Sequence, residues 1–285
     1  MNTKNKMLAG LIGAGIQGSS SPQIHEDEAK ALGIDLIYKI IDFAEPKRDP
    51  SFLENMLLAT ESLEFKGLNI THPYKADALK LMDTLSDDAK NIGSVNTVIF
   101  KNGKRHGDNT DWLGFAENLK ENLPDLVLDK VALIGTGGAG LAVAYAILKM
   151  GARDLHLFDA DADKASHLAD ALCKSFPGRR VTVAESASKA LENADGMINA
   201  TPIGMSGIPG MPVEASLLHK ELWVADIVYF PLETELLKTA KSIGCRTVGG
   251  GGMVVRQAAA SFRQFFDTEP DIARMLKHFT ELQQS

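Results

Sequence analysis

KVALIGTGGAGLAVAYAILKMG, residues 130–151, decides the fold. An apolar run of strand length leads into a glycine-rich turn, and a segment of helical composition follows. Gly135, Gly137 and Gly140 have the spacing G-x-G-x-x-G, which permits a tight turn, close approach of a pyrophosphate and close packing of helix on strand. The N–H groups and the dipole at the start of the helix favour phosphate. The stretch therefore predicts a dinucleotide-binding loop, completed by Thr136, Gly138 and Ala139.

A carboxylate ends the next predicted strand. In DLHLFD, residues 154–159, Asp159 lies where an acid can accept hydrogen bonds from the adenosine ribose. The alternative is a structural turn with an incidental surface aspartate. A 2′-phosphate would meet Asp159 with Asp161 and Asp163 close behind, and Lys164 is the nearest cation. Because like charges repel, NAD is expected as the cofactor rather than NADP.

Short apolar runs alternate with helical periodicity on both sides of this loop, which is typical of βαβ units. We predict an α/β protein of two domains. Residues 1–111, completed by C-terminal helices at 255–285, form an α/β substrate-binding catalytic domain, and residues 112–254 form a Rossmann domain with a doubly wound parallel sheet that binds NAD. Strands are predicted at 8–13, 36–42, 65–71, 94–100, from 130, and at 154–159, 180–185, 196–201 and 222–229, and helices at 22–33, 51–63, 112–123, 141–150 and 161–175.

The composition limits the partners. The chain has 285 residues, a formal charge of −7 and a pI near 5.5, which argues against a diffuse nucleic-acid-binding surface. Cys173 and Cys245 form no CxxC motif, so we expect buried free thiols and no metal site. The N-terminus is too short and glycine-rich for a signal peptide, and no apolar run has membrane-spanning length. We expect a cytoplasmic monomer or homodimer with a small-molecule substrate and neither nucleic-acid nor membrane partners.

Two serines precede the first predicted helix, which we expect to start at Pro22. In GSSSP, residues 18–22, Ser21 alone is explained as a helix N-cap. Ser19 and Ser21 together can instead hold a carboxylate at the end of the helix.

Further polar side chains stand at the ends of predicted strands of the first domain. In GLNITHPYK, residues 67–75, Asn69 and Thr71 share one side of a strand, and Lys75 follows on the next turn. Asn96 is predicted at a mid-strand position, where a buried amide needs partners. Asn109 and Asp111 lie at the domain junction, near which we expect a cleft. Each of these residues has a structural explanation as a turn former or a solvated side chain, but together they indicate a binding site.

Seven motifs occur in order over nearly the whole chain: GLIG…SSSP..H, LNITHPYK, IGSVNTV, GDNTDW, GTGGAG, NATPIGM and GGGGMVVRQAA. In this order they resemble the shikimate dehydrogenase family. The resemblance implies a two-domain enzyme that interconverts a polyhydroxy cyclic acid and its 3-dehydro form with a nicotinamide cofactor.

The resemblance also implies roles for individual residues. Lys75 and Asp111 match the catalytic pair, with Lys75 acting as the base or as a cation that stabilises the developing alkoxide. Ser19 and Ser21 match the serines that bind the substrate carboxylate. The other substrate-binding residues are implied to be Asn69, Thr71, Lys75, Asn96, Asp111, Tyr229 and Gln257. The nicotinamide-side loops are implied to contain Asn199, Ala200, Thr201 and Pro202, and Gly251 and Met253.

Three departures from the family pattern direct the prediction further. Gly18 replaces a usual histidine, Glu26 a common asparagine, and DAD at 159–161 an Asn-Arg-Thr-like run of the biosynthetic NADP enzymes. The last change resembles the NAD-dependent quinate/shikimate dehydrogenase branch, which is often catabolic. We therefore predict NAD-dependent oxidation of the C3 hydroxyl of shikimate and of quinate.

Other functions remain open from the sequence. One is the NADP-dependent shikimate dehydrogenase of aromatic amino acid biosynthesis, and a related one acts on an amino-substituted analogue of shikimate. A non-catalytic dinucleotide sensor would not need Lys75 and Asp111 together. A dehydrogenase acting on folate would not need the paired serines.

Overall fold

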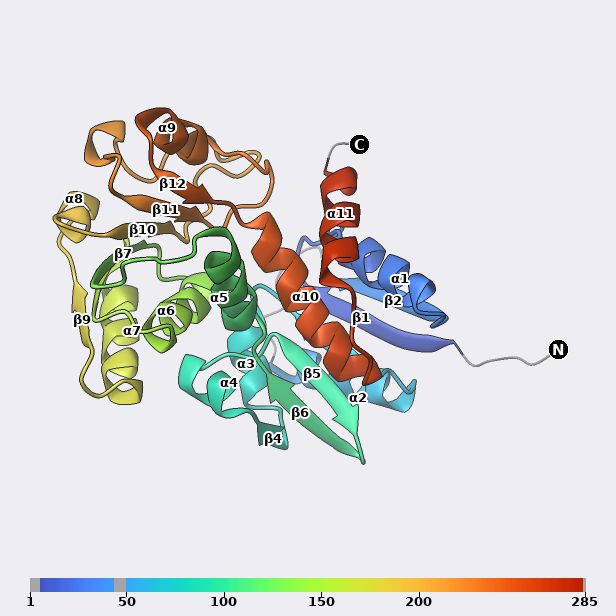
Figure 1. Ribbon diagram of the computed structural model, residues 1–285. Helices are drawn as coiled ribbons and strands as arrows, with labels where there is room; N and C mark the ends of the chain where they lie inside the picture. The colour runs from blue at the N-terminus through green and yellow to red at the C-terminus, as the bar shows by residue number, and fades with distance from the viewer. Residues whose placement is uncertain (1–5, 44–49, 284–285) are drawn as a thin grey trace. The chain divides into compact units, whose positions relative to one another are not determined.

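The computed structural model describes residues 6–43 and 50–283 (Figure 1). The chain divides into two compact units. Unit 1 contains Met1–Thr110 and Gln257–Ser285, and unit 2 contains Asp111–Arg256. The chain returns from unit 2 to unit 1 between Arg256 and Gln257, inside one continuous helix, α10 (Gly251–Phe266). Among the described residues, no helix is both long and apolar enough to cross a bilayer.

Unit 1 is built on a mixed six-stranded sheet in the order β2-β1-β3-β5-β6-β4. β1 pairs in parallel with β2 and β3, whereas β5 is antiparallel to both of its neighbours. The unit's elements are β1 (Met7–Gly13), α1 (Ser21–Ala31), β2 (Leu36–Asp42), α2 (Pro50–Ser62), β3 (Gly67–Ile70), α3 (Lys75–Leu79), β4 (Thr84–Leu85), α4 (Asp87–Ile92), β5 (Thr97–Lys101), β6 (Lys104–Asp108) and α11 (Ile272–Leu282).

A tight hairpin turns the chain back between β5 and β6. Asn102 and Gly103 both have positive φ, 56° and 66°, as a two-residue hairpin turn requires. Residues 104–108 form β6, which is absent from the strands predicted from the sequence. The sheet of unit 1 is therefore mixed at β5, within the predicted α/β class.

The two faces of the unit 1 sheet bury different helices. Leu53 and Leu57 of α2 share one core with Leu68 and Ile70 of β3. Phe262 and Phe265, from the part of α10 that belongs to unit 1, share the other core with β1 and β2. Gly67 lets this helix approach, because a Cβ there would collide with the Phe265 ring. Asn69 alternates with Leu68 and Ile70 along β3, which places it on the face that α10 covers.

A buried ion pair fastens α11 to α1, and the two helices lie side by side in Figure 1. Glu28 is fully buried, and its carboxylate accepts two hydrogen bonds from Arg274, at 2.7 and 2.8 Å. It also accepts one from the backbone N–H of Asp271 at 2.7 Å. The bidentate geometry offsets the cost of burying this charge.

Unit 2 has a fully parallel sheet in the order β12-β11-β10-β7-β8-β9. Counted from β7, this is the doubly wound order 3-2-1-4-5-6 of the Rossmann fold, which confirms the predicted fold class. The strand order reverses between β7 and β10. Its elements are α5 (Asp111–Asn122), β7 (Lys130–Ile134), α6 (Gly138–Lys149), β8 (Asp154–Phe158), α7 (Ala162–Ser175), β9 (Arg180–Val183), α8 (Ala187–Leu191), β10 (Gly196–Asn199), β11 (Trp223–Asp226), α9 (Glu235–Ile243), β12 (Arg246–Val248) and the start of α10 (Gly251–Phe266).

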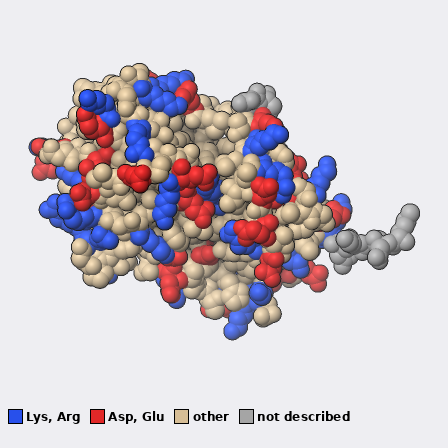
Figure 2. All heavy atoms as spheres, viewed as in Figure 1, with Lys and Arg blue, Asp and Glu red and all other residues tan. Residues whose placement is uncertain are grey.

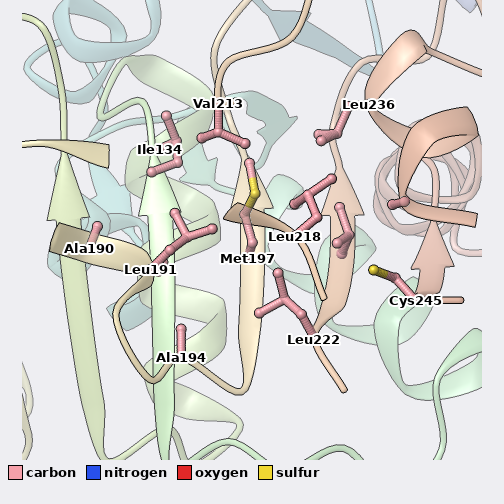
Figure 3. Close-up of a cluster of buried hydrophobic side chains, with 13 residues drawn as sticks. Ile134, Ala190, Leu191, Ala194, Met197, Val213, Leu218, Leu222, Leu236 and Cys245 are labelled. Carbon is pink, nitrogen blue, oxygen red and sulfur yellow. The ribbon is translucent and has the colours of Figure 1, made fainter. Parts of the chain in front are cut away.

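One face of this sheet holds an apolar cluster, in which Ile134, Met197 and Leu236 point toward one another (Figure 3). Cys245 is buried in the same cluster, as expected. Cys173 is exposed, so the prediction that both thiols are buried is wrong for that residue.

Candidate active site

The glycine loop of unit 2 has the backbone that a dinucleotide needs. Gly135 has a φ of +96°, and a Cβ there would lie 2.7 Å from the carbonyl carbon of Ala200. A Cβ on Gly140 would collide with the carbonyl oxygen of Gly135. Gly137 and Gly138 instead face open space, and no side chain caps the start of α6. The loop thus fits a pyrophosphate, with Thr136 and Ala139 completing it.

Asp159 follows β8 and is held by three donors. Its Oδ2 accepts from the Thr136 N–H at 2.6 Å and from the Thr136 hydroxyl at 2.8 Å. Its Oδ1 accepts from the Asp161 N–H at 2.9 Å. Partial burial raises the pKa of Asp159, but the hydrogen bonds from Asp161 and Thr136 lower that pKa by more, so it falls below its ordinary value. The group is an ionised acceptor at neutral pH. Lys164 pairs with Asp161 at 3.1 Å.

The loop after β10 folds around the buried side chain of Asn199. The Asn199 Oδ1 accepts from the N–H and the hydroxyl of Thr201, at 3.0 and 2.7 Å. Its Nδ2 donates to the Ile203 carbonyl at 3.1 Å and to Asp226 at 2.9 Å. These bonds shape the segment that contains Ala200 and Pro202. Gly251 and Met253 lie in the first turn of α10, in the same unit.

Asp226 was not identified from the sequence, although an aspartate inside the apolar run LWVADIVY is a signal for it. Burial raises its pKa, against hydrogen bonds from Thr234, the Val228 N–H and Asn199. Thr234 donates to it at 2.7 Å. Asp226 therefore stabilises the loop after β10 by accepting the hydrogen bond from Asn199.

In unit 1, Ser19 and Ser21 lie at the start of α1. The Ser19 hydroxyl donates to the Ser21 oxygen at 3.0 Å and accepts the Ser21 N–H at 3.2 Å. The helix N-cap is Ser20, whose side chain makes no capping bond, so the expected N-cap role of Ser21 and the helix start at Pro22 are wrong. Both serine hydroxyls are thus placed together at the end of β1, the strand that precedes them.

A second set of polar side chains lies where β3 pairs with β5. The antiparallel register pairs Asn69 with Thr97. Asn96 precedes β5 rather than lying mid-strand. Its Oδ1 accepts from the Thr110 N–H at 2.7 Å and its Nδ2 donates to the Thr110 hydroxyl at 3.1 Å. Because β5 is antiparallel to β3, the start of β5 lies at the carboxyl end of β3, beside Asn69 and the following Thr71.

Lys75 begins α3, one short turn after β3. Its carbonyl accepts the Val95 N–H at 2.9 Å, which ties the start of α3 to the segment before β5. Gln257 is the first residue of α10 that belongs to unit 1, whereas Asp111 begins α5 in unit 2. Tyr229 follows β11 in unit 2 and is 42% exposed.

His25 and Tyr38 hydrogen-bond with Ser21 and Asn69, respectively, and were not identified from the sequence as site residues. The His25 ring stacks on Tyr38 with centroids 4.4 Å apart. Its Nδ1 lies 2.9 Å from the Ser21 carbonyl and its Nε2 3.4 Å from the Ser261 hydroxyl. A carbonyl only accepts, so Nδ1 carries the proton. Burial lowers the pKa of His25 from 6.5 to about 4, although the bond to Ser21 raises it.

This shift predicts a dependence of stability on pH. A histidine whose pKa is lower in the folded state stabilises the protein above pH 6.5 and loses that contribution as the pH falls toward about 4. The slope is about 1.4 kcal/mol per pH unit, or about 3 kcal/mol over the window. As the pH falls between these values, we expect the urea-unfolding midpoint of His25→Asn to decrease less than that of the wild type.

His167 provides the matched control, because its Nδ1 also contacts the carbonyl four residues earlier, at 2.7 Å, but its side chain is exposed. His167→Asn should keep the wild-type slope. Equal slopes in the wild type and His25→Asn would contradict the assignment.

Within residues 6–43 and 50–283, no cluster of three or more metal-ligating side chains occurs. In the view of Figure 2, acidic and basic side chains are interspersed over the visible face.

A Rossmann unit with an open glycine loop and a carboxylate after its second strand, joined to a second α/β unit with polar side chains at the ends of its strands, has the architecture of a nicotinamide-dependent oxidoreductase. Residues 11–98 match the model of the shikimate dehydrogenase substrate binding domain. The chain is 46% identical to shikimate dehydrogenase (NADP(+)) of Streptomyces avermitilis over 98% of this chain and 97% of the relative. It belongs to the shikimate dehydrogenase family.

Two further similarities concern proteins of Corynebacterium glutamicum. The quinate/shikimate dehydrogenase (NAD(+)) is 42% identical over 98% of this chain and 99% of the relative. The solved structure of a quinate dehydrogenase in complex with NAD superposes with a TM-score of 0.92, at 41% identity, and covers 97% of this chain and 99% of that chain. Relatives named for either nicotinamide cofactor thus have similar identity to this chain.

Proposed function

We propose that the protein is an NAD-dependent dehydrogenase that reversibly oxidises the C3 hydroxyl of shikimate, and of quinate, to the 3-dehydro product. The observation that carries the proposal is the set of polar side chains near the carboxyl ends of β1 and β3 in unit 1, the unit that contains the region matching the substrate-binding domain. We further propose a cytoplasmic monomer or homodimer, since the charge of −7 favours a dissolved protein.

Small hydroxyl groups suit the carboxylate of such a substrate. Ser19 and Ser21 can orient the anion without an unpaired buried charge. Quinate carries an extra hydroxyl on the carbon that bears the carboxylate, and two short serine side chains leave room for it. We propose Asn69, Thr71, Asn96, Tyr229 and Gln257 for the ring hydroxyls.

Lys75 is proposed to contact the C3 oxygen. When bound, the nicotinamide supplies the acceptor for the hydride that leaves C3. The C3 oxygen then loses its proton, so a base or a cation at that oxygen lowers the barrier. We propose that Lys75 supplies this group and that Asp111 shares the proton as the second member of the pair.

The preference for NAD is proposed from Asp159. An ionised carboxylate after β8 suits ribose hydroxyls and repels a 2′-phosphate, and the nearby Lys164 is paired with Asp161. NADP is the second candidate, favoured by the Streptomyces relative whose name carries it.

The test is a matrix of shikimate and quinate against NAD and NADP, followed through the absorbance of the reduced cofactor. We expect turnover of both acids with NAD and a higher kcat/KM with NAD than with NADP. A clear preference for NADP would overturn the cofactor proposal, and failure to oxidise either acid would overturn the substrate proposal.

A further inference from the structure

Tyr38 lies on β2, an edge strand of the unit 1 sheet, and is held by several neighbouring residues. Its backbone N–H donates to the Glu26 carboxylate at 2.7 Å. Its ring stacks on His25 with an interplanar angle of 23°. Its hydroxyl donates to Asn69 Oδ1 at 2.7 Å. Glu26, the departure from the asparagine common in the family, thus anchors an edge strand whose outward N–H would otherwise lack a protein partner.

A chain of hydroxyl groups runs through Tyr38. Ser19 donates to Ser21 at 3.0 Å. Burial raises the pKa of Tyr38, and a side-chain hydrogen bond with Ser21 lowers that pKa by less. The phenol has one proton, which it donates to Asn69, so its oxygen accepts the hydrogen bond from Ser21. The direction is therefore Ser19 to Ser21 to Tyr38 to Asn69.

This chain fixes which end of the Asn69 amide is available to a ligand. The Tyr38 hydroxyl occupies Oδ1 with a short bond. The Nδ2 donates to the Asn96 carbonyl at 3.4 Å and to the Thr97 hydroxyl at 3.3 Å, both near the limit for a hydrogen bond. Both N–H groups of the Asn69 amide thus make only long bonds, which an oxygen of a ligand can replace, whereas the short bond at Oδ1 sets the orientation of the amide.

We propose that Tyr38 is a positioning residue of the substrate site: it locks Asn69 as a hydrogen-bond donor toward an oxygen of the substrate and couples that donor to the serine pair. The proposal rests on the proposed function. The serine hydroxyls can turn toward a carboxylate while Tyr38 continues to hold Asn69. The group facing Asn69 must then be an acceptor oxygen, as a ring hydroxyl or a keto oxygen is.

Tyr38→Phe removes the hydroxyl and keeps the ring that stacks on His25. The loss of one hydrogen bond predicts a KM for shikimate about 3- to 10-fold higher. We expect kcat and the KM for NAD to change by less than about twofold. Tyr145→Phe, a buried tyrosine of unit 2, is the matched control and should leave the KM for shikimate unchanged. An unchanged KM in Tyr38→Phe would overturn the inference.

A double-mutant cycle separates positioning from general support of the fold. If Tyr38 acts through Asn69, adding Tyr38→Phe to Asn69→Ala should change the KM by less than about twofold. Additive effects would mean that Tyr38 supports the site without acting through Asn69, and would overturn the proposal.

A spectroscopic measurement keeps the inference independent of turnover. The side-chain NH2 resonances of Asn69, identified by their loss in Asn69→Ala, should move in Tyr38→Phe and stay in place in Tyr145→Phe. If the wild type oxidises neither acid but these resonances move, the proposed function fails while the Tyr38–Asn69 lock stands. If they do not move, the lock is overturned whatever the activity.

Discussion

Lys75→Ala is expected to lower kcat for the oxidation of shikimate by about 10³-fold, within the range for loss of a general acid–base or charge-stabilising group. The KM should change by less than about threefold, because the proposed contact strengthens only as the C3 oxygen loses its proton. Steady-state kinetics with saturating NAD measure both quantities.

The fold should tolerate this substitution. Lys75 begins α3, and its link to the segment before β5 uses the backbone carbonyl, which alanine keeps. Alanine is also the best helix former. A loss of activity can therefore be assigned to the side chain, provided that circular dichroism shows the native fold.

Lys80, at the other end of α3, is the matched control. It is exposed and pairs with Asp77 at 3.5 Å. Lys80→Ala removes the same positive charge at the C-cap of the same short helix and should keep kcat within about twofold, since exposed pairs contribute little. Near-normal turnover in Lys75→Ala, or equal losses in the two variants, would contradict a chemical role for Lys75.

The Rossmann unit could be predicted from the sequence because its signals are local. The glycines of GTGGAG and the acid after the next strand lie within one βαβ segment, and the structure shows the open loop and the held carboxylate there. Short elements gave no comparable signal. β4 has two residues and β12 three, too few for a period of two to show.

The direction of β5 could not be predicted from the sequence, because alternating strands and helices give no signal for an antiparallel neighbour. The Asn102-Gly103 turn was visible, but the partner strand KRHGD is polar and does not resemble a strand. The predicted strand at 94–100 also began three residues before β5 does, which placed Asn96 inside it. In the structure, the antiparallel start of β5 brings it to the edge that bears Asn69.

The support of the candidate site could not be read from the sequence, because its bonds join residues far apart in the chain. Tyr38 meets Asn69 across 31 positions, and His25 meets Ser261 across 236. Each of these residues, taken alone, looks like ordinary core. Only their packing shows that they orient polar groups.

Asp159→Ala is expected to shift cofactor preference, lowering the ratio of kcat/KM for NAD to that for NADP by about 10²-fold or more. Hydrogen bonds to a charged acceptor contribute about 1.5–3 kcal/mol, so their loss alone weakens the use of NAD by about 10- to 100-fold. Removal of the carboxylate also relieves repulsion of a 2′-phosphate, which improves the use of NADP. Initial rates with each cofactor at saturating shikimate measure the ratio.

Alanine is a better test than asparagine at this position. All three groups that hold Asp159 are donors, from Thr136 and Asp161, and an asparagine would turn its own N–H2 toward one of them. Asp163→Ala, in the first turn of α7, removes one exposed negative charge nearby and should leave the ratio within about threefold.

The two roles available to Asp159 give different outcomes. A carboxylate that recognises the ribose changes NAD and NADP in opposite directions when it is removed. A carboxylate that only holds the loop at Thr136 weakens both cofactors to the same degree, because both place a pyrophosphate on that loop. Equal losses with NAD and NADP would therefore limit Asp159 to supporting the loop, and the preference for NAD would need another cause.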